Sequence, residues 1–231
     1  RDDINADDKI EFNDEKKNTI NFEFIKGRLK ARYNSLSPQA AVRYFKKLCE
    51  DTPSNENKYA YISALQSNGQ TDQALNVMNE ILKKFPKNLI LNTTKSEILL
   101  SGQRLSNAQK NIEQVLNISP GNYPASIMKA KILSSKKEFI KAEEILRDLL
   151  ISKNRDPGLW MQLSEVQRAG KNIVGYHLSR GEYYTLIGDF DNALNQFQFA
   201  LSLSGNSFQT SETIMTKIKF AKERLGRRRG F

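Results

Sequence analysis

The chain has 231 residues, of which 39% are hydrophobic and 27% are charged, so it can bury a core and is neither disordered nor fibrous. No segment approaches the roughly 18 to 20 consecutive apolar residues that a membrane span needs, and the opening segment RDDINADDKIEFNDEKKN is the reverse of a signal peptide. The formal net charge is +10. The single cysteine excludes an internal disulfide and is compatible with a reducing or an oxidising compartment.

An acidic segment opens the chain and a basic segment closes it. Residues 1–18 hold four Lys/Arg against seven Asp/Glu, and we expect a linker or leader that is extended or poorly ordered. The final segment KIKFAKERLGRRRGF holds seven basic residues against one acidic residue. A basic surface is typical of proteins that bind nucleic acid, anionic lipid or acidic proteins, but it is also consistent with a solvated helix end.

A 34-residue period runs through residues 19–156. Alanine recurs with this spacing at Ala40, Ala74, Ala108 and Ala142. Thirty-four residues is the length of a tetratricopeptide repeat (TPR), which forms one helix-turn-helix per unit. The period therefore defines four units, at 21–54, 55–88, 89–122 and 123–156.

Each unit has the pattern of two amphipathic helices. In the segment TDQALNVMNEILKKFPKN, the residues Ala74, Met78 and Ile81 lie on one helix face, and Pro86 ends the helix. We therefore predict an all-α fold, a TPR-type α-solenoid of antiparallel helix pairs with about 12 helices.

The pattern is displaced near the C-terminus. The unit 174–207 matches the repeat best, through Gly181, Tyr184, Gly188, Ala193, Phe197 and Ala200. An in-phase unit would begin at 157, so the displacement of 17 residues corresponds to one extra helix, which we place at 157–173 around DPGLWMQLSEVQRAGK. We expect residues 208–225 to form a capping helix and residues 226–231 a basic tail.

The C-terminal segments resemble a known family. Its pattern is matched by His177, Leu178, Glu182, Tyr183, Tyr184, Gly188 and Asp189. In this respect the chain resembles the C-terminal TPR domain of bacterial HExxH zinc metalloproteases of the β-barrel-assembly-enhancing group, over roughly residues 20–205. The segment NFEFIKGRLKAR is similar to the helix that follows the protease domain in that group. The chain itself contains no HExxH, so the resemblance implies a zinc-binding catalytic domain upstream of this chain.

No pattern in the chain predicts a catalytic, metal or cofactor site of its own. His177 is the only histidine, which leaves no zinc-ligand cluster, and we expect it to pack or hydrogen-bond between helices. Cys49 is more than three repeats away from it. Ser134 and Lys137 match S-x-x-K, but this short pattern is common by chance in a chain rich in Ser and Lys. We expect no cofactor here, and zinc only in the presumed upstream domain.

The function that remains is binding, in the concave groove that the first helices of TPR units line. We expect this groove to contain Ile25, Leu29, Arg32, Tyr33, Tyr59, Ser63, Gln66, Thr93, Glu97, Leu100, Ile127, Lys131 and Ser134. Such a mixture suits an extended, partly apolar polypeptide, although its apolar members are equally compatible with packing between repeats.

Two functions follow from these patterns. The first, which the family resemblance implies, is a protein-interaction domain of a periplasmic zinc metalloprotease in outer-membrane protein assembly and quality control, peripheral to the outer membrane. The resemblance implies as partners the barrel-assembly machinery, unfolded outer-membrane proteins or the chain's own protease domain. The alternative is a nucleic-acid-binding helical repeat, which the basic composition favours.

Overall fold

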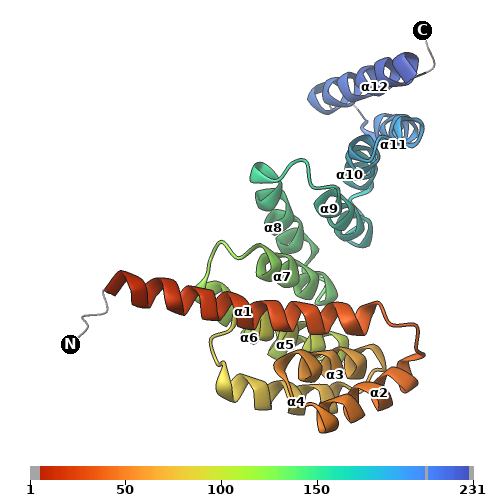
Figure 1. Cartoon of the computed structure of the whole chain (residues 1–231). Helices are drawn as coiled ribbons and strands as arrows, with labels where there is room; N and C mark the ends of the chain where they lie inside the picture. Colours follow the sequence, from red (N-terminus) through yellow and green to blue (C-terminus); the bar gives the residue numbers. More distant parts are fainter. Residues whose placement is uncertain (1–5, 206–207, 229–231) are drawn as a thin grey trace. The chain divides into compact units, whose positions relative to one another are not determined.

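The computed structural model describes the backbone of residues 6–205 and 208–228 and the side chains of residues 18–205 and 208–227, and all its regular elements there are helices (Figure 1). The twelve helices are α1 (Ala6–Arg32), α2 (Pro38–Asp51), α3 (Asn55–Ser67), α4 (Thr71–Lys84), α5 (Leu89–Ser101), α6 (Leu105–Ile118), α7 (Tyr123–Ser135), α8 (Phe139–Ser152), α9 (Pro157–Ala169), α10 (Ile173–Leu186), α11 (Phe190–Leu203) and α12 (Phe208–Arg228). The predicted all-α class is confirmed. The extra helix expected near 157–170 is α9, and the expected capping helix is α12.

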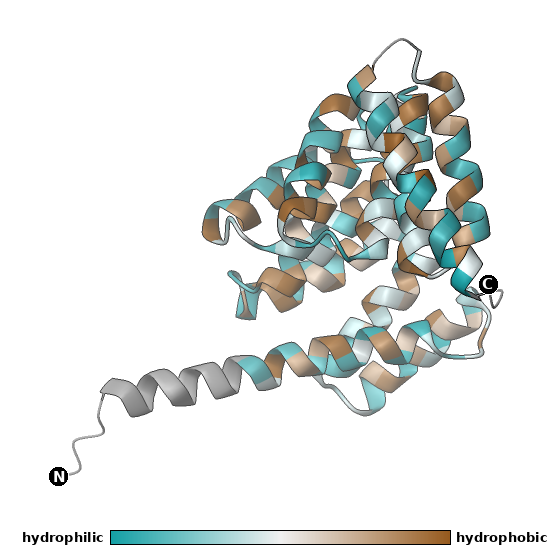
Figure 2. Ribbon diagram, turned by 90° about the horizontal axis from the view of Figure 1, so that it is seen from above, coloured by the Kyte–Doolittle hydropathy of each residue, from teal (hydrophilic) through white to brown (hydrophobic). Residues whose placement is uncertain are grey.

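The helices form two compact units, residues 1–120 and residues 121–231. In the first unit, α1 and α2 both pack on α3. Helix α3 then packs on α4, α4 on α5, and α5 on α6. In the second unit, each helix from α7 to α12 packs on the next. Hydrophobic and hydrophilic residues alternate along the helices (Figure 2), as expected where each helix buries one face.

Helix α1 is longer than the other helices that begin a repeat. It starts at Ala6, so residues 6–18, which we expected to be extended or poorly ordered, are helical in the structure. Lys30 and Arg32 fall in its last turn. Basic residues at the C-terminus of a helix favour helix formation through the helix dipole. Residues 1–5 lie outside the described part of the chain.

The C-terminal half of α1 packs closely on α3. Phe24 is fully buried, with its ring centroid 5.6 Å from that of Tyr59 and 5.9 Å from that of Phe85. A Cβ atom added at Gly27 would lie 2.3 Å from the carbonyl oxygen of Glu56. Only glycine therefore allows the two backbones to approach this closely.

One backbone conformation recurs in the turns α3–α4, α5–α6, α7–α8 and α9–α10, but not in the α1–α2 turn. A residue with positive φ stands at Gly69, Gln103, Lys137 and Lys171, with φ of 73°, 58°, 65° and 62°. In each turn its N–H donates to the carbonyl oxygen three residues earlier. The 34-residue spacing thus continues through the turn between α9 and α10.

Helix α10 lies between two turns of this kind. The turn after it contains Gly188, with φ of 78°, only 17 residues beyond Lys171. By its position, α10 is the second helix of a pair with α9 and also the first helix of a pair with α11. This double position is the structural origin of the half-repeat displacement that the sequence shows.

The buried residues of α10 are small, because neighbours lie on both of its sides. They are Gly175, Ser179 and Gly181. A Cβ atom at Gly181 would lie 2.2 Å from Cε1 of Phe197, and Phe197 is only 1% exposed. The Phe197 ring of α11 therefore occupies the space that a residue larger than Gly181 would need.

Buried polar groups join α8, α9 and α10. The Ser179 hydroxyl donates to Oε1 of Gln167 over 2.7 Å, and Nε2 of Gln167 donates to Glu143 over 2.9 Å. Burial raises the pKa of Glu143, but hydrogen bonds from Gln167, Arg147 and Asn172 outweigh it and hold that pKa below its usual value. The carboxylate stays ionised between the helices.

Asp156 connects α7 to α9. One of its carboxylate oxygens caps α9 by accepting the N–H of Gly158 over 2.8 Å and that of Leu159 over 3.3 Å. The other oxygen accepts the hydroxyl of Tyr123, the first residue of α7. The Tyr123 hydrogen bond lowers the pKa of Asp156, while burial and then Asp156 raise the pKa of Tyr123 to about 12.

Gly181→Ala should destabilise the second unit, because its new methyl group overlaps the buried Phe197 ring. We expect a net loss of about 2 kcal/mol in the free energy of unfolding, as is usual for an overpacked core. Trp160, the only tryptophan, lies in α9 and reports on this unit in urea unfolding followed by fluorescence. The control is Gly226→Ala in α12, whose Cβ would meet no atom within 4 Å and should stabilise slightly. Equal stability of Gly181→Ala and wild type would contradict the close α10–α11 packing.

Tyr123→Phe should remove about 1 kcal/mol of stability at neutral pH, the usual contribution of one hydrogen bond. Because the folded pKa of Asp156 is lowered, its contribution is present above pH 4 or so and disappears as the pH falls through that folded pKa. Because the folded pKa of Tyr123 is raised, its contribution disappears as the pH rises toward about 12. The wild-type advantage in urea unfolding should therefore shrink at both pH extremes. Tyr176→Phe is the control, and a pH-independent advantage would contradict the pairing.

Candidate functional site

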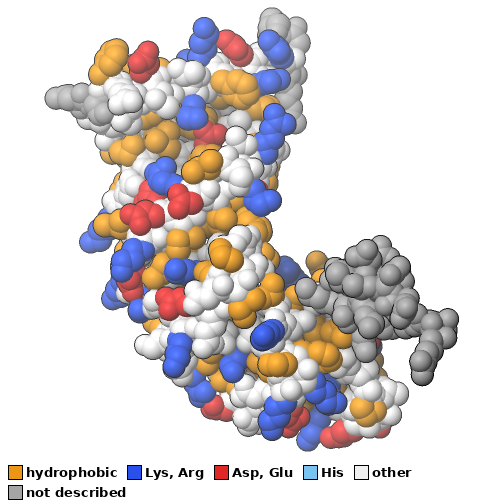
Figure 3. Space-filling view, turned by 90° about the vertical axis from the view of Figure 1, so that its left-hand side faces the viewer, with side chains coloured by type: hydrophobic (Ala, Val, Ile, Leu, Met, Phe, Trp, Pro, Cys, Tyr) orange, Lys and Arg blue, Asp and Glu red, His pale blue; other side chains and the backbone are white. Residues whose placement is uncertain are grey.

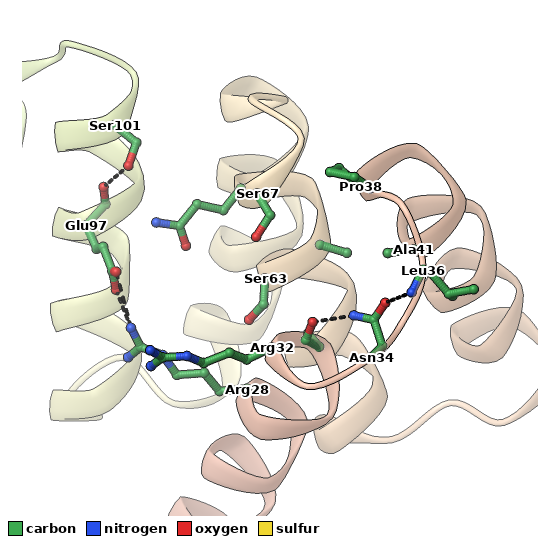
Figure 4. Close-up of a pocket in the computed structure, with 13 residues that line it drawn as sticks. Arg28, Arg32, Asn34, Leu36, Pro38, Ala41, Ser63, Ser67, Glu97 and Ser101 are labelled. Carbon is green, nitrogen blue, oxygen red and sulfur yellow. Dashed lines mark hydrogen bonds and ion pairs between the residues drawn. The ribbon is translucent and has the colours of Figure 1, made fainter.

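The first unit contains an open pocket of about 620 Å³ between α1, α2, α3 and α5 (Figure 4). It is lined by Arg28, Ala31, Arg32, Asn34, Leu36, Pro38, Ala41, Ser63, Ala64, Gln66, Ser67, Glu97 and Ser101. Helices α1, α3 and α5 are the first helices of successive repeats. We call this pocket the unit 1 groove.

Four residues predicted for the groove meet in this pocket. They are Arg32 from α1, Ser63 and Gln66 from α3, and Glu97 from α5. Most of the side chains at the pocket wall are polar, so the unit 1 groove is less apolar than the sequence suggested.

An ion pair crosses one end of the unit 1 groove. Nη2 of Arg28 lies 2.9 Å from Oε2 and 3.2 Å from Oε1 of Glu97. Arg28 and Glu97 keep 48% and 30% of their side-chain surface exposed, so the pair contributes little to stability but fixes the direction of both side chains. Sequence analysis missed Arg28, which stands one helical turn before Arg32.

Arg32 reaches into the same groove (Figure 4). Its guanidinium carbon lies 5.9 Å from the centroid of the Tyr33 ring. No carboxylate oxygen among the side chains of residues 18–205 and 208–227 lies within ion-pair distance of it. Arg32 is exposed and lacks a counter-ion in this part of the structure.

Small polar side chains and several small apolar ones form the rest of the groove wall. Ser63 donates its hydroxyl to the carbonyl oxygen of Tyr59 over 3.0 Å, and Ser101 donates to that of Glu97 over 3.0 Å. Serine at these positions occupies little volume and still offers an acceptor oxygen. The α1–α2 loop closes one side, where Asn34 accepts the N–H of Leu36 over 2.8 Å.

The prediction that Tyr59 faces the groove is wrong. Tyr59 is fully buried, and its hydroxyl is hydrogen-bonded to that of Thr94. Burial raises the pKa of the phenol. Its ring packs on Phe24, because α1 covers this face of α3. Tyr59 is a core residue and is not accessible to a partner.

Other predicted residues of the first unit lie outside the pocket. Ile25, Leu29 and Tyr33 are 47%, 48% and 76% exposed, and together with Phe22 they form a separate apolar stripe along α1 and the residue that follows it. Thr93 and Leu100 are half-buried on α5. The predicted groove therefore combines residues of two different surfaces.

The predicted residues of the second unit lie on α7. Ile127 is half-buried and packs against the core cluster of α7, α8 and α9, so for this residue the structure favours packing between helices. Lys131 is exposed, and Ser134 is half-buried next to the α7–α8 turn. None of the three lines the unit 1 groove.

His177 and Cys49 have structural surroundings. Nδ1 of His177 is 2.9 Å from Oε1 of Gln196, and the ring centroids of His177 and Phe199 are 5.4 Å apart. These contacts join α10 to α11. Burial raises the pKa of the Cys49 thiol, which makes it a poorer nucleophile. Within the described residues, no group of three or more His, Cys, Asp or Glu could hold a metal ion, and no helix is long and apolar enough to cross a membrane.

Comparison with known proteins defines the fold. No family model matches the chain, and no curated protein matches it. A tetratricopeptide repeat protein from Parabacteroides merdae superposes with a TM-score of 0.53 and 17% identity, over 88% of this chain and 84% of that one. The chain has a TPR-type fold. The MamA RS-1 ArsTM double mutant gives a TM-score of 0.50 at 12% identity, over 79% of this chain and 95% of that one. A chain of the APC/C hetero-tetramer Cut9–Hcn1 gives 0.50 at 15% identity, over 90% of this chain and 42% of that one.

Proposed function

We propose that this chain is a protein-interaction module that binds an extended polypeptide segment in the unit 1 groove. The observation that supports this most directly is the open pocket between α1, α3 and α5, lined by hydrogen-bonding side chains from three helices. Such a wall can pair with the main-chain N–H and C=O groups of an extended peptide.

The openness and polar composition of the groove fit a peptide better than a compact small molecule. The pocket has a volume of about 620 Å³ and opens to solvent. Its wall includes charged, hydroxyl and amide groups. Small-molecule sites are enclosed and mostly apolar. An extended peptide needs only an accessible trough with spaced polar contacts.

We further propose that the module belongs to a periplasmic zinc metalloprotease that acts in outer-membrane protein assembly and quality control. This rests on the sequence resemblance at His177 to Asp189. Zinc would then be bound by the upstream protease domain, and the partners would be the barrel-assembly machinery, unfolded outer-membrane proteins or that protease domain. The gene sequence upstream of Arg1 should encode an HExxH motif. An open reading frame that extends upstream without this motif would contradict the proposal.

A nucleic-acid partner is the alternative that the net charge of +10 raises. Lys and Arg are scattered over the face drawn in Figure 3 and are not gathered in one patch. In the described residues, cation–aromatic contacts such as Arg32–Tyr33, Arg180–Tyr184 and Arg224–Phe220 occur on different helices. A stacking platform for bases would need several of them together. We therefore place a polypeptide first, and salt-sensitive binding of single-stranded RNA would favour the alternative.

Ser63→Trp should block the unit 1 groove. The half-buried Ser63 lines the pocket, and an indole there would fill much of the space beside α1 and α5. In selection from a random displayed peptide library with the full chain as bait, we expect enrichment to fall about tenfold or more, as for loss of a central contact. Ser106→Trp, at an exposed position of α6, is the control, and circular dichroism checks that both variants fold. Unchanged enrichment with Ser63→Trp would show that peptides bind elsewhere.

A further inference from the structure

The unit 1 groove contains an unbalanced pair of arginines. Arg28 and Arg32 are four residues apart on α1, so their guanidinium groups leave the same helix face and both reach toward α5 (Figure 4). Among the described residues that line the pocket, Glu97 is the only acidic one, and it pairs with Arg28. Like charges at this spacing disfavour each other unless a counter-ion lies between or beside them.

The arrangement also selects the sign of a ligand's charge. Both carboxylate oxygens of Glu97 lie within hydrogen-bond distance of Arg28, at 2.9 and 3.2 Å, so Glu97 is already paired and offers little to a basic ligand. Arg32 has no such partner in the described residues. A guanidinium is an always-charged, planar donor whose geometry matches a carboxylate.

We propose that the unit 1 groove recognises an acidic peptide, with an Asp or Glu side chain of the partner bound to Arg32 and to the outer edge of Arg28. This rests on the proposed function, because it names the chemistry of the segment that the same groove holds. The ligand carboxylate gives Arg32 the counter-ion that Glu97, already paired with Arg28, does not supply.

The remaining groove residues fit the chain on either side of that carboxylate. Ser63, Gln66 and Ser67 lie along α3, next to the α1 arginines, and carry hydroxyl and amide groups. They can pair with peptide N–H and C=O groups, whatever the neighbouring side chains are. The site therefore requires one acidic position and tolerates variation around it.

The test compares two arginine variants of equal charge. The full chain serves as bait for a random displayed peptide library, alongside Arg32→Ala and Arg43→Ala. Arg43 is exposed on α2 and does not line the pocket. We expect wild type and Arg43→Ala to enrich peptides with Asp or Glu at one fixed position, and Arg32→Ala to lose this preference.

A selected acidic peptide is then measured by fluorescence anisotropy. Replacing its acidic residue by Asn or Gln should weaken binding about tenfold, as should Arg32→Ala, whereas Arg32→Lys should recover part of the loss. Added salt should weaken the acidic peptide more than its amide version.

Two results would overturn the carboxylate assignment alone. One is peptide binding that Ser63→Trp abolishes but that shows no acidic preference, which leaves the proposed function standing. The other is tighter binding of a matched phosphoserine peptide, which would assign the site to phosphate. Equal losses in Arg32→Ala and Arg43→Ala would show diffuse attraction in place of a site. Enrichment that persists in Ser63→Trp would overturn the proposed function itself.

Discussion

The left-handed residue in the turn between paired helices is the constraint on which the rest of the fold depends. L-residues other than glycine adopt this conformation at a cost, yet Gln103, Lys137 and Lys171 do so at the 34-residue spacing that begins with Gly69. The cost is acceptable because the turn reverses the chain at the same point after each first helix of 13 residues in α3, α5, α7 and α9. Residues 34 positions apart in consecutive first helices of a unit, such as Ser67 and Ser101, then face the same side.

The chemistry of the groove follows from this repetition and from one exception to it. Ser67 and Ser101 occupy equivalent positions 34 residues apart and face the same pocket. The turn after α1 contains no residue with positive φ. Helix α1 is positioned at the groove by its close contact with α3 at Gly27. This contact sets the rotation of α1 about its axis. It therefore decides that the arginines of α1 face the groove while its exposed apolar stripe faces away.

Much of the fold could be predicted from the sequence, but only part of the groove. Apolar periodicity and the recurrent alanines predict the helices, since burying one helix face is a local requirement of each repeat. The contacts of α1 involve residues far apart in the sequence, as in Phe24 with Phe85 and Arg28 with Glu97. No local pattern shows them, and so Tyr59 was assigned to the wrong surface and Arg28 was missed. The helical start of α1 was obscured by its acidic composition, which is also typical of linkers.

Because α10 is also the first helix of a pair, the first helices are odd-numbered up to α9 and even-numbered from α10 onward. In the first unit, Tyr59 of α3 bonds to Thr94 of α5, 35 residues away and on the next odd-numbered helix. In the second unit, Glu182 of α10 pairs with Lys217 of α12, also 35 residues away but on the next even-numbered helix. An array built in this way can grow by single helices as well as by pairs. The last helix of such an array, here α12, can then expose to solvent the face that a following helix would cover. The pair of helices before it needs no change.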